Sequence, residues 1–282
     1  MRTVFSLLSF VKCLLPAALL LLAHGTTAAP KAELWPFWQP KAVVDTAHAQ
    51  PSMDAWQAFL NTYVSPDADG VNRVAYGEVT QDDKDRLRKQ LDALAGLDPR
   101  EWPELEQQAF WINTYNMAVV NLVLNHYPLE SIKDIRLSFK SLFNAGPWED
   151  KVLVVAGEKL SLNDIEHRIL RPIWNDARFH FALNCASIGC PNLSAEVYRA
   201  DTLDAQLEQA QSEFLQSSRA FAESGDGYRV SSIFNWYWQD FAPEKKQLWR
   251  YFQKQGLIDR EVERFRYDYD WRLNDKATLN EE

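Results

Sequence analysis

The stretch ELEQQAFWINTYNMAVVNLVLN, residues 104–125, decides the fold of this chain. From Ala109 to Leu124 the residues are apolar almost all the way round a helix, and a helix that is apolar on every side is buried. The dipeptide Tyr127-Pro128 ends the helical pattern. The sequence therefore predicts one long central helix, around which the rest of the molecule packs.

Two amide side chains interrupt this apolar helix. Asn113 and Asn116 lie three residues apart and so share one face of it. Because a buried amide needs hydrogen-bond partners, these side chains either tie the helix to neighbouring backbone or line a binding site. Both interpretations stay open on the sequence alone.

Shorter elements surround the central helix. Apolar periodicity and capping residues predict helices over residues 53–63, 82–94, 162–171, 203–221 and 243–252. Strands are predicted over residues 152–155, 178–184 and 228–234, with an extended segment over 264–271. This irregular interleaving favours one α+β domain, with helices packed on a short-stranded mixed or antiparallel sheet.

The first 28 residues have the order of a secretory signal. Arg2 opens it, an uncharged core covers residues 14–23, and small residues precede the expected cleavage site after Ala28. The core is too short for a spanning helix, which needs about 20 apolar residues. We therefore expect a periplasmic or secreted protein, with no stable membrane span after cleavage. An extended arm over 29–52, a globular domain over 53–275 and a polar tail over 276–282 complete the expected organisation.

The charge balance limits the possible partners. Loss of Arg2 and Lys12 with the signal takes the formal net charge from -9 to -11. Such an acidic chain is not expected to bind nucleic acid. The chain has no glycine-rich phosphate loop, no Gly-x-Ser-x-Gly elbow and no His-Glu-x-x-His motif, so no cofactor is predicted. The expected ligand is a small molecule or a peptide.

The mature chain keeps two cysteines, Cys185 and Cys190, in the run HFALNCASIGCP, residues 180–191. One interpretation is a nucleophilic thiol, for which Cys185 needs a nearby base or cation. His180 and His167 are the candidate bases. In a regular strand His180 points to one face and Cys185 to the other, so direct pairing requires a bend at Asn184.

Two other interpretations use the same residues. Outside the cytoplasm the cysteines tend to form a disulfide, provided that their Cα atoms approach within about 7 Å. A metal site could combine them with His167, His180 or Glu166, but zinc sites use a shorter spacing between cysteines, and no metal is predicted. Glu166 falls toward the buried side of its helix, so it needs a partner: Arg168, Arg171 or a histidine.

Four ordered motifs resemble one known family, the domain-of-unknown-function family 547. They are AFWINTYN at residues 109–116, LSLNDIEHRILR at 160–171, the run at 180–191, and YDWRLN at 269–274. The resemblance spans residues 53–275 and implies a shared fold, but the family carries no known activity. It also extends distantly to papain- and transglutaminase-like thiol enzymes, which pair a Cys with a His and an Asp or Asn. In those enzymes the Cys opens the central helix, whereas the matching helix here has none.

The sequence leaves two hypotheses about function. The first is an exported cysteine-dependent hydrolase or acyl transferase. It has Cys185 as nucleophile, His180 or His167 as base, and Glu166 or Asn184 as the group that orients the base; Asn113, Asn116 and Cys190 are the predicted binding residues. The alternative is a non-catalytic envelope binding or scaffold domain with structural or disulfide-bonded cysteines.

Overall fold

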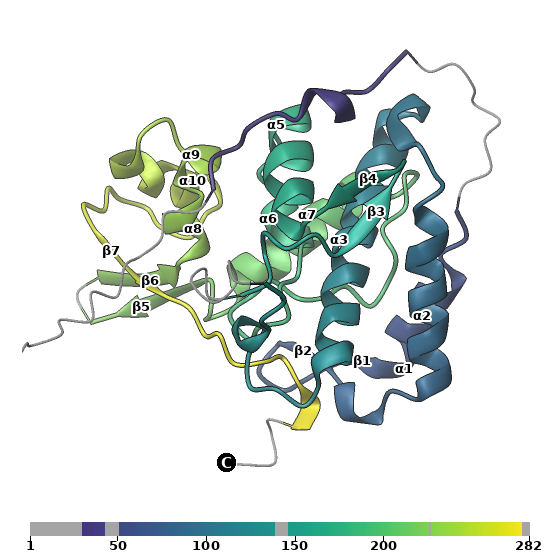
Figure 1. Cartoon of the computed structure of the whole chain (residues 1–282). Coiled ribbons are helices and arrows are strands. Elements are labelled where there is room, and N and C mark those ends of the chain that lie inside the picture. Colours follow the sequence, from purple (N-terminus) through teal and green to yellow (C-terminus); the bar gives the residue numbers. More distant parts are fainter. Residues whose placement is uncertain (1–29, 43–50, 139–145, 226, 278–282) are drawn as a thin grey trace, which may run out of the picture.

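The computed structural model describes residues 30–42, 51–138, 146–225 and 227–277. The predicted export signal and most of the predicted polar tail lie outside these residues. The described chain has an α+β fold with one long helix and three small sheets, which confirms the predicted fold class (Figure 1).

The predicted central helix is α3, Glu104–His126, and it is buried over nearly its whole length. Helices α1 (Asp54–Tyr63) and α2 (Gln81–Leu94) pack beside it, as Figure 1 shows. Two antiparallel hairpins complete this side: β1 (Val64–Pro66) with β2 (Asn72–Val74), and β3 (Leu153–Val155) with β4 (Glu158–Leu160). Their apolar side chains form the first hydrophobic cluster, which is centred on α3.

A second hydrophobic cluster is built from the C-terminal part of the chain. Its sheet has the order β5-β6-β7, with Phe221–Ser224 antiparallel to Gly227–Ser231 and Phe265–Asp268 parallel to the latter. The helices around it are α7 (Leu203–Gln216), α8 (Ile233–Trp236), α9 (Trp238–Phe241) and α10 (Leu248–Lys254). The helix predicted over 203–221 thus ends at Gln216, and residues 221–224 pair as a strand instead.

The segment that follows Ser161 is helical for longer than predicted. Ser161 and Asp164 form a reciprocal cap, because each backbone N–H donates to the other side chain. The π-helix η5 (Asp164–Leu170) continues into α5 (Arg171–Trp174), whereas the sequence predicted an end before Pro172. Pro172 lies in the first turn of α5 and has no N–H to donate back along the helix; the carbonyl of Arg168, four residues before it, instead accepts the N–H of Trp35.

The predicted strand over residues 178–184 is wrong. Phe179–Ala182 form a short helix, α6, and the chain becomes extended only at Leu183. A short apolar run does not distinguish a buried strand from a buried helical turn. Here the turn places Phe179 in the first hydrophobic cluster and Phe181 in the second. Both rings are buried, so α6 lies where the two clusters meet.

Residues 30–41 of the predicted arm lie against the domain. The backbone N–H groups of Glu33 and Trp35 donate to the carbonyls of His167 and Arg168. The short 3-10 helix η1 (Pro36–Trp38) then buries Trp38 edge-on against Trp111 of α3, at 4.9 Å between ring centroids. In Figure 1 this purple segment crosses above α5.

Candidate functional site

Cys185 and Cys190 form a disulfide in this structure, with 6.1 Å between their Cα atoms. They close a short loop, residues 185–190, which we call the cysteine loop. Cys190 is 4% exposed, while Cys185 is only partly buried. Any reagent from solution therefore meets the sulfur of Cys185 first.

Local packing explains the path of the cysteine loop. The Asn184 side chain bridges the loop: it donates to the carbonyl of Pro191 at 2.7 Å and accepts from the N–H of Ala186 at 2.9 Å. Gly189 passes close to the segment after β7, because its N–H donates to the carbonyl of Asp270 at 2.8 Å. A Cβ at position 189 would lie 2.7 Å from the backbone nitrogen of Asp270, so only glycine fits.

Hydroxyl groups surround the sulfur of Cys185. Tyr269 Oη lies 2.9 Å from Cys185 Sγ, and Ser187 Oγ lies 3.2 Å from it. Ser187 donates to Tyr269 Oη at 3.0 Å, which leaves the phenol proton of Tyr269 to point at the sulfur. The sulfur of Cys190 accepts the backbone N–H of Cys185 at 2.8 Å. Each sulfur therefore has a hydrogen-bond donor.

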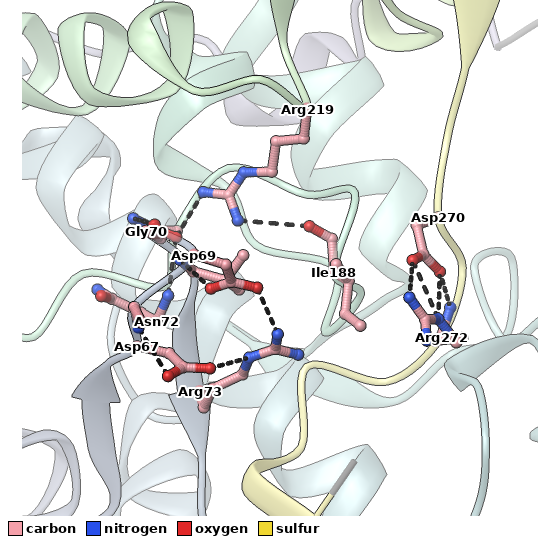
Figure 2. Close-up of polar contacts among 12 residues, drawn as sticks. Asp67, Asp69, Gly70, Asn72, Arg73, Ile188, Arg219, Asp270 and Arg272 are labelled. Carbon is pink, nitrogen blue, oxygen red and sulfur yellow. Dashed lines mark hydrogen bonds and ion pairs between the residues drawn. The ribbon is translucent and has the colours of Figure 1, made fainter. Parts of the chain in front are cut away.

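One arginine holds the far end of the cysteine loop. Arg219 donates to the carbonyl of Ile188 at 3.4 Å and to Asn192 Oδ1 at 2.6 Å (Figure 2). Among the described residues no carboxylate lies within ion-pair distance of its guanidinium, and its buried Nε has no hydrogen-bond partner. Burial accordingly lowers the pKa of Arg219 to about 10, so it still carries its charge at neutral pH.

Beside the cysteine loop lies a buried charged cluster made of Glu166, His167, Arg171, His180 and Asp240. His180 Nε2 lies 2.6 Å from Asp240 Oδ2, and its Nδ1 lies 3.5 Å from Glu166 Oε1. Arg171 makes a bidentate pair with Asp240, at 2.6 and 3.0 Å, and donates to His167 Nδ1 at 3.0 Å. The His180 ring stacks on Tyr237 at 4.2 Å.

The charged cluster shifts the pKa values of its members in different directions. Burial lowers the pKa of His167 to about 4. Burial opposes a charge on His180 too, but its hydrogen bonds to Asp240 and Glu166 outweigh that effect and raise its pKa. Burial would raise the pKa of Glu166, yet the neighbouring histidines and Arg171 lower it to about 2. The cluster therefore keeps His167 neutral at neutral pH, while the carboxylates around His180 favour its charged form.

The structure brings some of the predicted site residues together and separates others. Glu166, His167 and His180 meet in one cluster, and a histidine is the nearest charged partner of Glu166, one of the predicted possibilities. Within the described part of the chain, however, no hydrogen bond joins either histidine to the sulfur of Cys185. Asn184 shapes the loop and orients no histidine.

The two asparagines of α3 are occupied by backbone. Asn113 donates to the carbonyl of Tyr198 and accepts its N–H, at 2.8 and 3.0 Å. Asn116 donates to the carbonyl of Ala182 and accepts the N–H of Asn184, both at 2.9 Å. These contacts fit the first of the two interpretations of their burial: the amides fasten the chain on either side of the cysteine loop to α3.

Sequence reasoning missed three residues of this site. Asp240 and Arg219 carry no signal in the sequence, since Asp240 lies in an aromatic-rich run and Arg219 in an ordinary polar stretch, and neither belongs to a recognisable motif. Tyr269 belongs to the motif YDWRLN, but its phenol reaches Cys185 only because the segment after β7 crosses the cysteine loop. The motif therefore singles out Tyr269 but does not indicate which residues its side chain contacts.

Two surface hollows adjoin this region. One, of about 520 Å³, is lined by Tyr269 and Trp271 together with acidic and polar side chains, among them Glu130 and Asp268. Tyr269, which contacts Cys185, thus also lines this hollow. The other, of about 720 Å³, lies over the face of α7 and is lined mainly by amide, hydroxyl and carboxylate side chains.

Among the described residues, no group of three or more His, Cys, Asp and Glu side chains is arranged to hold a metal ion. The same part of the chain contains no helix long and apolar enough to cross a membrane.

Comparison with known proteins gives one match. Residues 99–215 match the model of a family described as "Protein of unknown function, DUF547". The matched segment runs from η3 (Pro99–Glu101) to α7 and contains Glu166, His180 and the cysteine loop, but neither Asp240 nor Tyr269. No curated protein and no solved structure matches the chain.

Proposed function

Because the chain is a DUF547 domain-containing protein and the description of that domain names no activity, we propose its function from the site alone. We propose that it is an exported cysteine-dependent hydrolase or acyl transferase with Cys185 as the nucleophile. The observation that carries this proposal is the hydrogen bond between Tyr269 Oη and Cys185 Sγ, at 2.9 Å.

A thiol attacks as its thiolate, so the site must stabilise negative charge on sulfur. Tyr269 supplies the donor, since its Oη lies 2.9 Å from Cys185 Sγ; Ser187 Oγ lies 3.2 Å from the same sulfur and orients the phenol by donating to Tyr269 Oη. Burial raises the pKa of Tyr269 well above its usual range, so the phenol keeps its proton at neutral pH. After attack, the same proton can pass to the leaving group, which is the role of a general acid.

The proposal gives the histidines a positioning role. Both nitrogens of His180 face carboxylates, Asp240 at 2.6 Å and Glu166 at 3.5 Å. These contacts fix α6, and the cysteine loop starts three residues after that helix ends. His167 accepts a hydrogen bond from Arg171 and has a pKa of about 4, so it is a weak base.

A substrate would reach Cys185 through the hollow of about 520 Å³ that Tyr269 lines. Such a volume is at the size of small-molecule sites and also accepts the side chain of a peptide. In the disulfide Cys185 Sγ is bonded to Cys190 and cannot act as a thiolate. The proposed enzyme is therefore inactive until the disulfide is reduced.

Thiol labelling tests the nucleophile. In reduced protein, an iodoacetamide probe should modify Cys185 faster than it modifies a free cysteine peptide at the same pH. Cys185→Ala should abolish this fast labelling, whereas the matched Cys190→Ala variant should keep it without any reductant. A Cys185 no more reactive than the free peptide would reject the proposal.

An activated ester tests the reaction class. Reduced protein mixed with p-nitrophenyl acetate should show a mass gain of one acetyl group on Cys185 before steady hydrolysis, which is the signature of covalent catalysis. Tyr269→Phe should slow the process by about tenfold, since it removes a hydrogen bond to a charged group. Ester cleavage that is unchanged in Cys185→Ala would place the chemistry elsewhere.

The second candidate function is a non-catalytic binding or scaffold domain of the cell envelope. Two observations favour it. The thiol of Cys185 is bonded in the disulfide, and both ring nitrogens of His180 face carboxylates, whereas a thiol enzyme needs a free thiolate and a histidine free to accept its proton. It predicts a reduced protein that is stable and folded but forms no acyl adduct.

Export is part of the proposal. It rests on the secretory pattern of residues 1–28 and accords with a disulfide, which persists in oxidising compartments. Fractionation of cells that express the full chain should give a protein outside the cytoplasm whose mass lacks residues 1–28. A full-length protein in the cytoplasmic fraction would overturn this part.

A further inference from the structure

The two sulfurs of the disulfide have unequal surroundings. Cys190 is 4% exposed, whereas Cys185 is partly open to solvent beside the hollow lined by Tyr269. From this asymmetry we infer a further activity: the oxidised protein accepts electrons from dithiol substrates by thiol–disulfide exchange, with Cys185 as the attacked sulfur and Cys190 as the leaving sulfur.

The leaving sulfur has a donor ready for its negative charge. When the disulfide opens, Cys190 Sγ becomes a thiolate, and the backbone N–H of Cys185 already points at it from 2.8 Å. A backbone donor that belongs to the loop itself needs no rearrangement to serve the thiolate. Thiol–disulfide exchange is faster when the leaving thiolate is more stable.

The attacked sulfur is stabilised in the same way once it is released. Tyr269 donates its phenol proton toward Cys185 Sγ, and Ser187 fixes the direction of that proton by donating to Tyr269 Oη at 3.0 Å. Both sulfurs of the reduced pair are therefore hydrogen-bonded. Stabilising the reduced form of a disulfide makes the oxidised form a stronger oxidant.

Arg219 adds a positive charge next to the loop. Its guanidinium contacts Ile188 and Asn192, which lie two residues before and two residues after Cys190 (Figure 2). Both contacts are to neutral oxygens, and no carboxylate of the described residues pairs with it. A cation near a thiol favours thiolate over thiol, and here the charge of Asp69, which is itself paired with Arg73, offsets only part of the charge of Arg219. Arg219 is thus a positioning residue that also tunes the sulfurs.

The exchange balances with a dithiol as the only co-reactant. One substrate thiolate attacks Cys185 Sγ, the disulfide breaks, and its electron pair goes to Cys190 Sγ. The second substrate thiolate attacks the substrate sulfur of this mixed disulfide, and that electron pair goes to Cys185 Sγ. The substrate leaves as a disulfide, having lost two electrons and two protons, and the protein becomes a dithiol.

This activity does not depend on the proposed acyl transfer. Acyl transfer uses the reduced Cys185 and has no need of a second sulfur, whereas exchange uses the oxidised pair. Cys190→Ser therefore separates the two activities. It removes the leaving sulfur needed for exchange and leaves Cys185 as a free thiol.

Stoichiometric oxidation of a dithiol tests the inference. Oxidised full-chain protein is mixed without oxygen with a short synthetic peptide that carries two cysteines, and the peptide disulfide is measured by mass spectrometry. We expect one peptide disulfide per protein disulfide consumed, formed at least tenfold faster than with oxidised glutathione at the same concentration. No peptide oxidation above the buffer control, or a rate equal to that of glutathione, would overturn the inference.

A trapping experiment identifies the attacked sulfur. Reduced Cys190→Ser protein is mixed with a peptide that carries one cysteine, supplied as its disulfide with 5-thio-2-nitrobenzoate. Cys185 should displace the thionitrobenzoate and accumulate as a mixed disulfide with the peptide, since neither the peptide nor position 190 offers a second sulfur to release it. The matched Cys185→Ser variant should accumulate little, because Cys190 is buried. An adduct that forms faster on Cys190 would contradict the assigned order. Loss of the acetyl adduct from Cys190→Ser, with peptide oxidation by the native protein intact, would instead reject only the proposed acyl transfer.

The pH profile of labelling tests Arg219. In the reduced protein, Arg219→Gln should move the midpoint of iodoacetamide labelling of Cys185 upward by about one pH unit, while Arg219→Lys should restore most of the shift. A purely structural arginine would change the amplitude of labelling or the folding of the protein but not the midpoint. An unchanged midpoint in a folded Arg219→Gln protein would reject the electrostatic role.

Discussion

Glu166, His167 and His180 share one buried cluster but respond to pH in opposite senses. The folded-state pKa of His167, about 4, lies below its ordinary value of 6.5, so the unfolded chain binds more protons between these values. Stability from His167 is thus lost as pH falls from 6.5 toward 4. Glu166, with a pKa lowered to about 2, adds a further loss below pH 4.5. The pKa of His180 is raised, so its contribution is lost as pH rises above 6.5.

We therefore expect the free energy of unfolding to reach its maximum near pH 6.5, where neither histidine lowers it. Urea unfolding followed by tryptophan fluorescence between pH 4 and pH 9 measures this curve. His167→Gln should flatten the acid side, where the native histidine costs up to about 3 kcal/mol. His180→Gln should flatten the alkaline side. A maximum that stays above pH 8 in the native protein would contradict these pKa directions.

A second prediction at the residue scale concerns the close approach of Gly189 to the backbone of Asp270. Gly189→Ala should destabilise the fold by about 1–3 kcal/mol, because the added Cβ would lie 2.7 Å from the backbone nitrogen of Asp270. Gly96 is the matched control, since a Cβ at that position meets nothing within 4 Å. Thermal unfolding of the two variants measures the difference. Equal melting temperatures would mean that the cysteine loop and the segment after β7 separate easily.

At the scale of elements, the sequence predicts those helices and strands whose structure is determined by their own residues. The helix α3 is long and apolar on every side, and a buried helix is the secondary structure that such a long apolar run favours. The short run at 178–184 contains too few residues for its periodicity to decide, and tertiary packing made it the helical turn α6. The π-helix η5 was not predicted, because its widened hydrogen bonds leave no pattern in side-chain hydrophobicity.

The prediction at the scale of elements concerns the docked arm. Trp38→Ala should destabilise the protein by about 3–5 kcal/mol, because it empties a buried site against Trp111. Lys41→Ala, also in the arm, should cost less than about 1 kcal/mol, since its ion pair with Glu101 is exposed. Denaturant unfolding of both variants compares these costs. A Trp38→Ala protein as stable as Lys41→Ala would show that the arm is not part of the folded unit.

At the scale of the whole molecule, the candidate site lies where the two hydrophobic clusters meet. Cys185, Glu166 and His180 come from the segment that matches the DUF547 model, while Asp240, Arg219 and Tyr269 come from the part of the chain after it. Sequence reasoning found the first set because its residues are crowded into motifs. It could not find the second, because only the closure of the tertiary fold brings those side chains to the loop.

Reduction of the disulfide should act on the stability of the whole molecule. Opening a loop as short as residues 185–190 should lower the free energy of unfolding by about 2 kcal/mol, because the unfolded chain regains conformational freedom. Melting temperature with and without reductant measures the effect. A double variant, Cys185→Ala with Cys190→Ala, serves as the control and should melt at one temperature in both conditions. A native protein that is indifferent to reductant would indicate that the cysteines are not paired in solution.

The docking of the arm has a consequence for the order of events during biogenesis. Near the start of the described chain, the backbone N–H groups of Glu33 and Trp35 donate to the carbonyls of His167 and Arg168, and Arg171 donates to the carbonyl of Pro30. Residues 30–35 thus lack these partners until the ribosome has made the segment around η5, so this part of the arm docks only after more than half of the chain has been synthesised.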